Sequence, residues 1–200
     1  MLKHLSAFLL AATLLAAPAA AEPVIGQPAP DFEATDSNGT TIKLSELKGK
    51  PIVLEWTNDK CPFVVKYYKS GTMQQVQRTA TSMGATWLTV NSSAPGKQGH
   101  VDADGANALM TTSNATPAHY LLDPNGTIGR AYDAKTTPHM YVIDAEGTLV
   151  YMGAIDDKPT ADIADIDSAT NYVLAALTSL KDGKPIEPAS TQPYGCNVKY

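Results

Sequence analysis

The feature that most constrains the fold is a cysteine placed between a buried strand and a helix. Residues 50–56 form a nearly continuous apolar run, which predicts a buried strand. Cys61 follows in a short turn, and Pro62 stands where the first turn of a helix tolerates proline. The N–H groups and dipole of a helix N-terminus stabilise negative charge, and a thiolate is the reactive form of cysteine. We interpret Cys61 as a reactive thiolate. The alternative is a small buried hydrophobic residue, although the adjacent charges of Asp59 and Lys60 argue against deep burial.

Strands and helices alternate along the rest of the chain. We expect further strands at 31–36, 41–44, 85–90, 118–122, 140–144 and 148–152, and helices at 63–82 (interrupted at Gly71), 102–113 (capped by Asp102), 128–132 and 165–180. This order predicts an α/β domain with a central mixed sheet flanked by helices and an N-terminal β-hairpin. We place the domain at 22–182 and an irregular tail at 183–200.

Residues 1–21 have the pattern of a cleaved secretory signal peptide. Lys3 and His4 precede an apolar run at 5–17, and alanines at 19–21 offer a small-residue cleavage site. A retained membrane anchor is the alternative, but the run is shorter than the roughly 20 residues that span a bilayer. We therefore expect a periplasmic or secreted protein that has no membrane partner after cleavage.

The composition and the remaining motifs exclude several function classes. The formal net charge of −5 argues against binding to nucleic acid or to an anionic membrane. His100, His119 and His139 lack the spacing of a metal site, and residues 126–129 lack the third glycine of a dinucleotide-binding loop. We expect neither a metal nor another cofactor.

The chain contains two cysteines, Cys61 and Cys196. Val64 stands where a Cys-x-x-Cys motif would have its second cysteine, so a sulfenic acid on Cys61 would need a distant resolving thiol. Cys196 is the one candidate within the chain, and Gly195 before it suggests a segment mobile enough to reach a partner. A permanent structural disulfide is equally consistent with export, and it would stabilise the fold by about 4–5 kcal/mol in the chain-entropy model. The residues alone leave both interpretations open.

Two further sequence features bear on the site. Thr137-Pro138 precedes the strand expected at 140–144, and a strand start is a natural place for a cis-proline. Such a bond would turn the Thr137 backbone toward whatever lies beside it, and His139 is its neighbour. Thr57, four residues before Cys61, is a candidate support for the thiolate.

These segments together resemble the thioredoxin-fold redoxins, in particular a peroxiredoxin-like subgroup of the AhpC/TSA type. The similarity covers roughly residues 24–180 and is carried by 25–32 (IGQPAPDF), 44–51 (LSELKGKP), 61–64 (CPFV), Thr137-Pro138 and the tail 195–200 (GCNVKY). The family's Pro-x-x-x-Thr-x-x-Cys motif is altered here, since Asn58 stands three residues before Cys61 and Leu54 replaces the proline.

The resemblance implies a thioredoxin-like fold, an attacking role for Cys61 and a resolving role for Cys196. Thr57 and Pro138 complete the expected catalytic set, and Asn58, Thr137 and His139 the expected substrate-binding set. We expect an exported thiol-dependent oxidoreductase whose substrate is a peroxide or a protein disulfide and whose electrons come from an external thiol reductant. The alternatives are a thiol–disulfide exchange protein, or a non-catalytic thioredoxin-fold binding module with a structural Cys61–Cys196 disulfide.

Overall fold

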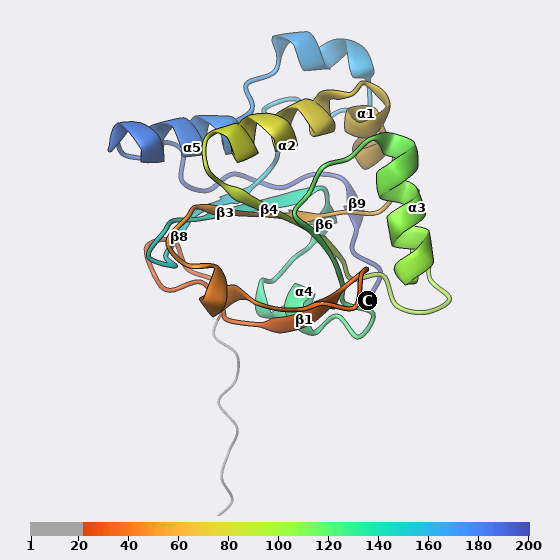
Figure 1. The fold of residues 1–200 in the computed structure, drawn as a ribbon. Coiled ribbons are helices and arrows are strands. Elements are labelled where there is room, and N and C mark those ends of the chain that lie inside the picture. Colours follow the sequence, from red (N-terminus) through yellow and green to blue (C-terminus); the bar gives the residue numbers. More distant parts are fainter. Residues whose placement is uncertain (1–21) are drawn as a thin grey trace, which may run out of the picture.

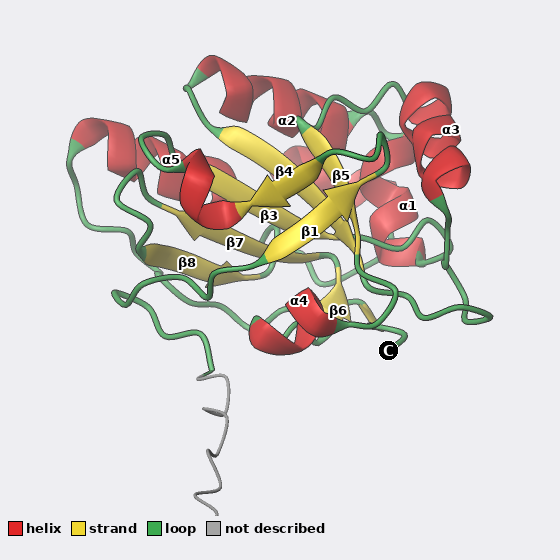
Figure 2. Cartoon of the chain, turned by 60° about the horizontal axis from the view of Figure 1, so that its bottom comes forward, coloured by secondary structure: helices red, strands yellow, loops and turns green. Residues whose placement is uncertain are grey.

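A computed structural model describes residues 22–200, so the predicted signal peptide at 1–21 lies outside the described residues. Its main feature is a seven-stranded sheet with the strand order β2-β1-β5-β4-β3-β7-β8 (Figures 1 and 2). The strands are β1 (Glu33–Asp36), β2 (Thr41–Lys43), β3 (Ile52–Trp56), β4 (Thr86–Asn91), β5 (His119–Leu122), β7 (His139–Ile143) and β8 (Leu149–Gly153). The three central strands β3, β4 and β5 are parallel, and the flanking pairs are antiparallel. The prediction of a mixed sheet with an N-terminal hairpin is confirmed.

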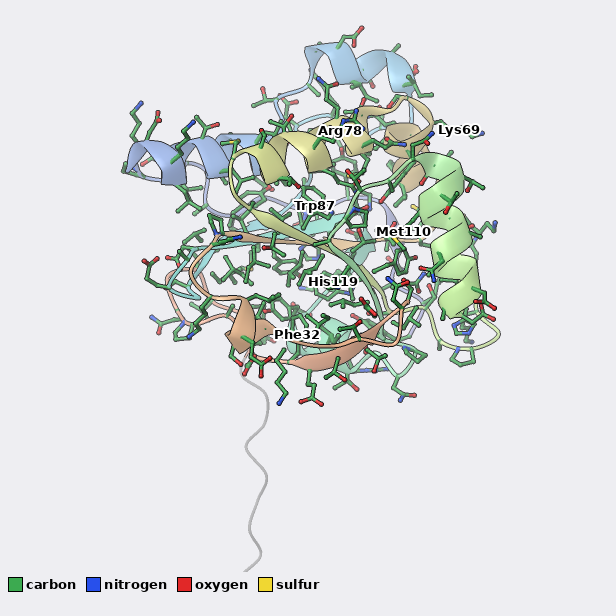
Figure 3. All side chains as sticks on the ribbon, in the orientation of Figure 1. Phe32, Lys69, Arg78, Trp87, Met110 and His119 are labelled. Carbon is green, nitrogen blue, oxygen red and sulfur yellow. The ribbon has the colours of Figure 1, made fainter. Side chains whose placement is uncertain are left out.

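Helices cover both faces of this sheet. The elements are η1 (Leu44–Leu47), α1 (Pro62–Lys69), α2 (Thr72–Ser82), α3 (Ala103–Ser113), α4 (Thr127–Ala131), η2 (Ile163–Ser168) and α5 (Tyr172–Asp182). In Figure 1, α2 and α5 lie on one face, α4 lies on the other, and α3 stands at one end. Figure 3 shows Trp87 between the sheet and the upper helices, where it belongs to a buried cluster with Val53 and Met140. The opposite face is packed by Trp56, Tyr132 and other apolar side chains.

Two helix predictions have different outcomes. The expected break at Gly71 is confirmed, because this glycine has a φ of +79° and separates α1 from α2. The helix predicted at 165–180 is wrong at its start. Asn171 caps α5 by accepting a hydrogen bond from the Leu174 N–H, and the Thr170 N–H donates to Asp157 instead of continuing a helix.

The tail follows the surface of the domain and is held along much of its length. Within it, β9 (Cys196–Asn197) pairs antiparallel with β6 (Thr136–Thr137). Before β9, the Thr191 N–H donates to Met152 O, and after it the Val198 N–H donates to Lys135 O. Cys196 is therefore placed by strand pairing and not by a freely moving segment.

Two properties of the described region bear on function. Among residues 22–200, none of the helices has the length and apolar character needed to cross a membrane. The same residues contain no group of three or more His, Cys, Asp or Glu side chains arranged to hold a metal ion.

Candidate active site around Cys61

Cys61 caps the N-terminus of α1. Its carbonyl oxygen accepts hydrogen bonds from the N–H groups of Val64 and Val65, and its own N–H donates to Asn58 O. Its side chain is completely buried, with 0% exposure, so the expectation that the adjacent charges would keep it near the surface is wrong. The burial comes from a distant segment, because the backbone before Pro138 covers the sulfur. Lys60 and Asp59 pair with each other at 2.6 Å.

The segment before Pro138 provides the first contact of the Cys61 sulfur. The Thr137–Pro138 peptide bond is cis, as predicted. The Cys61 thiol donates a hydrogen bond to Thr137 O, with a distance of 3.0 Å between Sγ and the oxygen. Two segments that are far apart in the sequence thus meet at the thiol.

Cys196 reaches the same site from the C-terminal tail. In the register of β6 and β9, Cys196 is the direct partner of Thr137, and the Thr137 hydroxyl lies 3.4 Å from Cys196 O. Gly195 makes this approach feasible, because a Cβ at that position would overlap the Thr137 carbonyl group. Both cysteines are free thiols in the structure. The fold therefore brings the two cysteines to one place.

The two thiols have different electrostatic environments. Burial raises the pKa of Cys61, but the neighbouring Cys196 thiol and the Thr137 side chain favour the thiolate, and the net result is a pKa below the ordinary 9.0. The pKa of Cys196 is raised to about 11 by burial and by the adjacent Cys61 sulfur. Cys61 therefore ionises first, while Cys196 stays protonated beside it.

The predicted neighbours of the sulfur have other partners. Asn58 is fully buried; its Oδ1 accepts the Lys60 N–H within the turn, and its Nδ2 donates to Gln98 O and so ties the turn to the loop after β4. Thr57 is buried, and its N–H donates to Val90 O. Among the described residues, no hydrogen bond joins the side chain of either residue to Cys61.

His139 lies in the apolar core beside Tyr141. Its Nδ1 is 3.0 Å from the Tyr141 hydroxyl and accepts the Lys135 N–H, and the two rings are 4.5 Å apart. Burial lowers the pKa of His139 to about 3, so the ring is neutral at physiological pH. Its described contacts are those of a structural histidine, and its predicted role in substrate binding remains a prediction.

A pocket of about 210 Å³ lies beside the cysteine turn and was not predicted from the sequence. Thr57 and Asp59 border it, and the buried Asp59 Oδ1 has no hydrogen-bond partner among the described residues. Figure 3 shows Met110, one of its lining residues, on α3. The other apolar lining residues include Val64, Val65, Tyr68, Leu109, Pro117 and Tyr120. The weakly amphipathic sequence of α3 gives little indication of such a pocket.

Comparisons with known proteins bear on the family and on the fold. A model of the AhpC/TSA family matches residues 25–152, whereas no curated protein sequence matches the chain. A hypothetical protein from Sinorhizobium meliloti 1021 is similar in structure, with a TM-score of 0.74 and 23% identity over 90% of this chain and 96% of that chain. Peroxidoxin BcpB from Mycobacterium tuberculosis has a TM-score of 0.56 and 17% identity, over 80% of this chain and 98% of that chain. A putative thiol:disulfide interchange protein DsbE from Chlorobium tepidum has a TM-score of 0.52 and 24% identity, over 78% and 99%.

At these identities the structural similarities show the fold, and the predicted thioredoxin-like fold is confirmed. The family model covers more than half of the chain and includes Cys61. The chain belongs to the AhpC/TSA family, a peroxiredoxin-like family of thiol oxidoreductases.

Proposed function

We propose that the protein is an exported two-cysteine peroxidase in which Cys61 is the attacking thiol and Cys196 the resolving thiol. The observation that carries the proposal is the β6–β9 register, which sets Cys196 opposite Thr137 while the Thr137 carbonyl contacts Cys61. The order of the two pKa values supports the assignment of roles, since Cys61 ionises first.

The proposed cycle balances in three steps. The Cys61 thiolate attacks the outer oxygen of a hydroperoxide, the O–O bond breaks, and an alcohol or water leaves once its oxygen has taken up a proton. The Cys196 sulfur then attacks the Cys61 sulfenic acid, an S–S bond forms and water is released. An external dithiol reduces this disulfide and is itself oxidised to a disulfide. Because Cys61 is fully buried in the described arrangement, we expect the oxidant to enter through a local opening of the site.

Mass spectrometry after one equivalent of hydrogen peroxide tests this proposal. The wild-type protein should lose two hydrogens and yield a Cys61–Cys196 peptide pair. Cys196→Ala should instead accumulate a sulfenic acid that a dimedone-type reagent traps on Cys61, and Cys61→Ala should consume no peroxide. Peroxide that persists with wild-type protein, with Cys61 unmodified, would remove the peroxidase assignment.

A second function, thiol–disulfide exchange with exported proteins, is favoured by one observation. The Asn58 amide is fully buried, its Nδ2 donates to Gln98 O in a separate loop and its Oδ1 accepts the Lys60 N–H, so its side chain is engaged in holding the site together and is turned away from an incoming peroxide. In exchange, the Cys61 thiolate would attack a sulfur of the substrate disulfide and release its other sulfur as a thiolate. A protein that reduces a model disulfide but ignores peroxide would support this function over the first.

Export is part of the proposal and rests on the N-terminal pattern. The polar start, the apolar run and the small residues at 19–21 support cleavage and release to the periplasm or the medium. Sequencing the N-terminus of the protein purified from the expressing cells tests this, and an intact residue 1 in the mature protein would contradict it.

A further inference from the structure

Tyr194, two residues before Cys196, is held by a buried polar cluster. Its hydroxyl donates to Asp156 Oδ1 and lies 2.6 Å from the Tyr67 hydroxyl, which itself donates to Asp156 Oδ2. The Tyr194 ring meets the Phe63 ring edge-on, with centroids 5.8 Å apart. Four side chains from three separate segments therefore converge directly before the tail cysteine. We call these four residues the Tyr194 anchor.

The anchor is built on the helix that Cys61 caps. Tyr67 and Phe63 are both residues of α1, and Tyr67 is fully buried. A shift of Tyr194 relative to this helix is therefore also a shift relative to Cys61.

The turn that contains Asp156, the third segment of the anchor, is also held in place. Asp156 is 3% exposed, and its Oδ1 also accepts the Lys158 N–H. The buried Lys66 on α1 donates to the carbonyl oxygens of Lys158 and Thr160, which ties this turn to the same helix. The anchor is thus a rigid reference point for the tail.

Tyr194 is the last side-chain attachment of the tail before the cysteine. Upstream, the Thr191 hydroxyl bonds to the Tyr151 hydroxyl and accepts the Ala154 N–H. Gly195, with a φ of +134°, is the single residue between Tyr194 and Cys196 and packs against the Thr137 carbonyl group, so the position of Tyr194 limits where Cys196 can lie. The start of β9 is therefore set by where the Tyr194 hydroxyl binds.

We propose that Tyr194 is a positioning residue that sets the effective concentration of the Cys196 thiol at Cys61. The inference rests on the redox pair of the proposed function and adds the device that holds that pair together. Burial and the Asp156 carboxylate raise the pKa of both phenols, so both hydroxyls stay protonated as donors at physiological pH. Each charge-assisted hydrogen bond of this kind holds the chain more strongly than a bond between neutral groups.

The test measures the disulfide equilibrium with glutathione and needs no peroxide. Oxidised glutathione and the reduced protein exchange to give the Cys61–Cys196 disulfide and two reduced glutathione molecules, so the equilibrium constant is an effective concentration of the two thiols. Tyr194→Phe keeps the ring on Phe63 and removes the hydroxyl, and it should lower this constant about tenfold or more. Tyr67→Phe leaves the Tyr194–Asp156 contact in place and should lower it less.

Tyr172→Phe is the matched control, since the Tyr172 hydroxyl makes no hydrogen bond within residues 22–200. It should leave the constant unchanged. Thermal unfolding of the reduced variants separates positioning from stability: Tyr194→Phe should change the glutathione constant even where the melting temperature stays close to that of the wild type.

The outcomes separate this inference from the proposed function. A wild-type protein that forms the disulfide, with a Tyr194→Phe variant whose constant lies within about twofold of it, overturns the positioning role and leaves the redox pair standing. A wild-type protein that forms no Cys61–Cys196 disulfide at any glutathione ratio overturns the pair itself and the inference with it. If Tyr194→Phe does not fold, Asp156→Asn takes its place, because it removes the charge that accepts the Tyr194 hydroxyl; an unchanged constant in that variant overturns the positioning role.

Discussion

Cys196 is the direct strand partner of Thr137, the residue whose carbonyl oxygen accepts the hydrogen bond of the Cys61 thiol at 3.0 Å. The short β6–β9 strand pair therefore fixes the position of the Cys196 thiol and also supplies the hydrogen-bonding group that contacts the Cys61 thiol. Changes to β9 should affect the pKa of Cys61 as well as disulfide formation.

Cys196→Ala should raise the pKa of Cys61. The variant loses a thiol that stabilises the Cys61 thiolate, while burial continues to disfavour the charge. The 13Cβ chemical shift of labelled cysteine, followed against pH, reports each thiol separately. The reciprocal variant Cys61→Ala should lower the pKa of Cys196 from about 11, because the adjacent sulfur no longer opposes a second negative charge. Unchanged values in both variants would show that the two thiols do not interact.

Gly195→Ala should displace β9 from β6. The added Cβ would overlap the Thr137 carbonyl group, and the strand cannot stay in register around it. We expect Cys61 to be alkylated about tenfold faster or more, because opening of the tail then costs less free energy. Alkylation kinetics followed by mass spectrometry measure this.

Gly183→Ala is the control for Gly195→Ala. Gly183 has a φ of +64°, also in the left-handed region, but a Cβ there meets nothing within 4 Å. This variant should lose about 1 kcal/mol of stability from backbone strain and leave the alkylation rate of Cys61 unchanged. Equal acceleration in both variants would mean that general destabilisation, and not the Thr137 overlap, exposes Cys61.

Glu55 should make the protein less stable as pH rises. Its buried carboxyl accepts hydrogen bonds from Tyr68, Trp87, Thr89 and Gln77, yet burial raises its pKa above the ordinary 4.5. Its contribution to stability is therefore complete below pH 4.5 and is lost as pH rises through the folded-state pKa. Glu55→Gln cannot ionise at this position. Between pH 4.5 and the folded-state pKa of Glu55, its free energy of unfolding should therefore rise relative to that of the wild type by up to about 1.4 kcal/mol per pH unit. Urea unfolding at a series of pH values checks this, and a difference that does not vary with pH would contradict it.

His139 should make the protein less stable as pH falls into the acid range. Its pKa of about 3 lies below the ordinary 6.5, so the neutral ring's contribution to stability is complete above pH 6.5 and is lost as pH falls toward 3. In His139→Phe this acid loss should be smaller, and the ring nitrogens of the wild type should show the neutral form by NMR at about pH 5. A wild-type ring already protonated at that pH would be inconsistent with a buried histidine whose Nδ1 accepts the Lys135 N–H.

The sequence predicted helix boundaries correctly where one residue at the boundary ends or begins the helix. Gly71 separates two helices because it adopts a left-handed conformation, and Asp102 caps α3 by accepting the Gly105 N–H. The helix predicted at 165–180 begins only at Tyr172 because the Thr170 N–H is held by Asp157, a contact from thirteen residues away that periodicity does not reveal. The burial of Cys61 was missed for a similar reason, since the residues that pack around its sulfur come from elsewhere in the chain.

The sequence by itself determined a strand, a cysteine and a helix in direct succession, and that order is sufficient to place Cys61 at a helix N-terminus. Only the tertiary structure decided what the thiol meets. The β6–β9 pairing and the Tyr194 anchor join segments that are distant in the sequence, through backbone register and hydrogen bonds to the buried Asp156. Such contacts depend on how the chain returns to itself, and no local pattern of residue types encodes them.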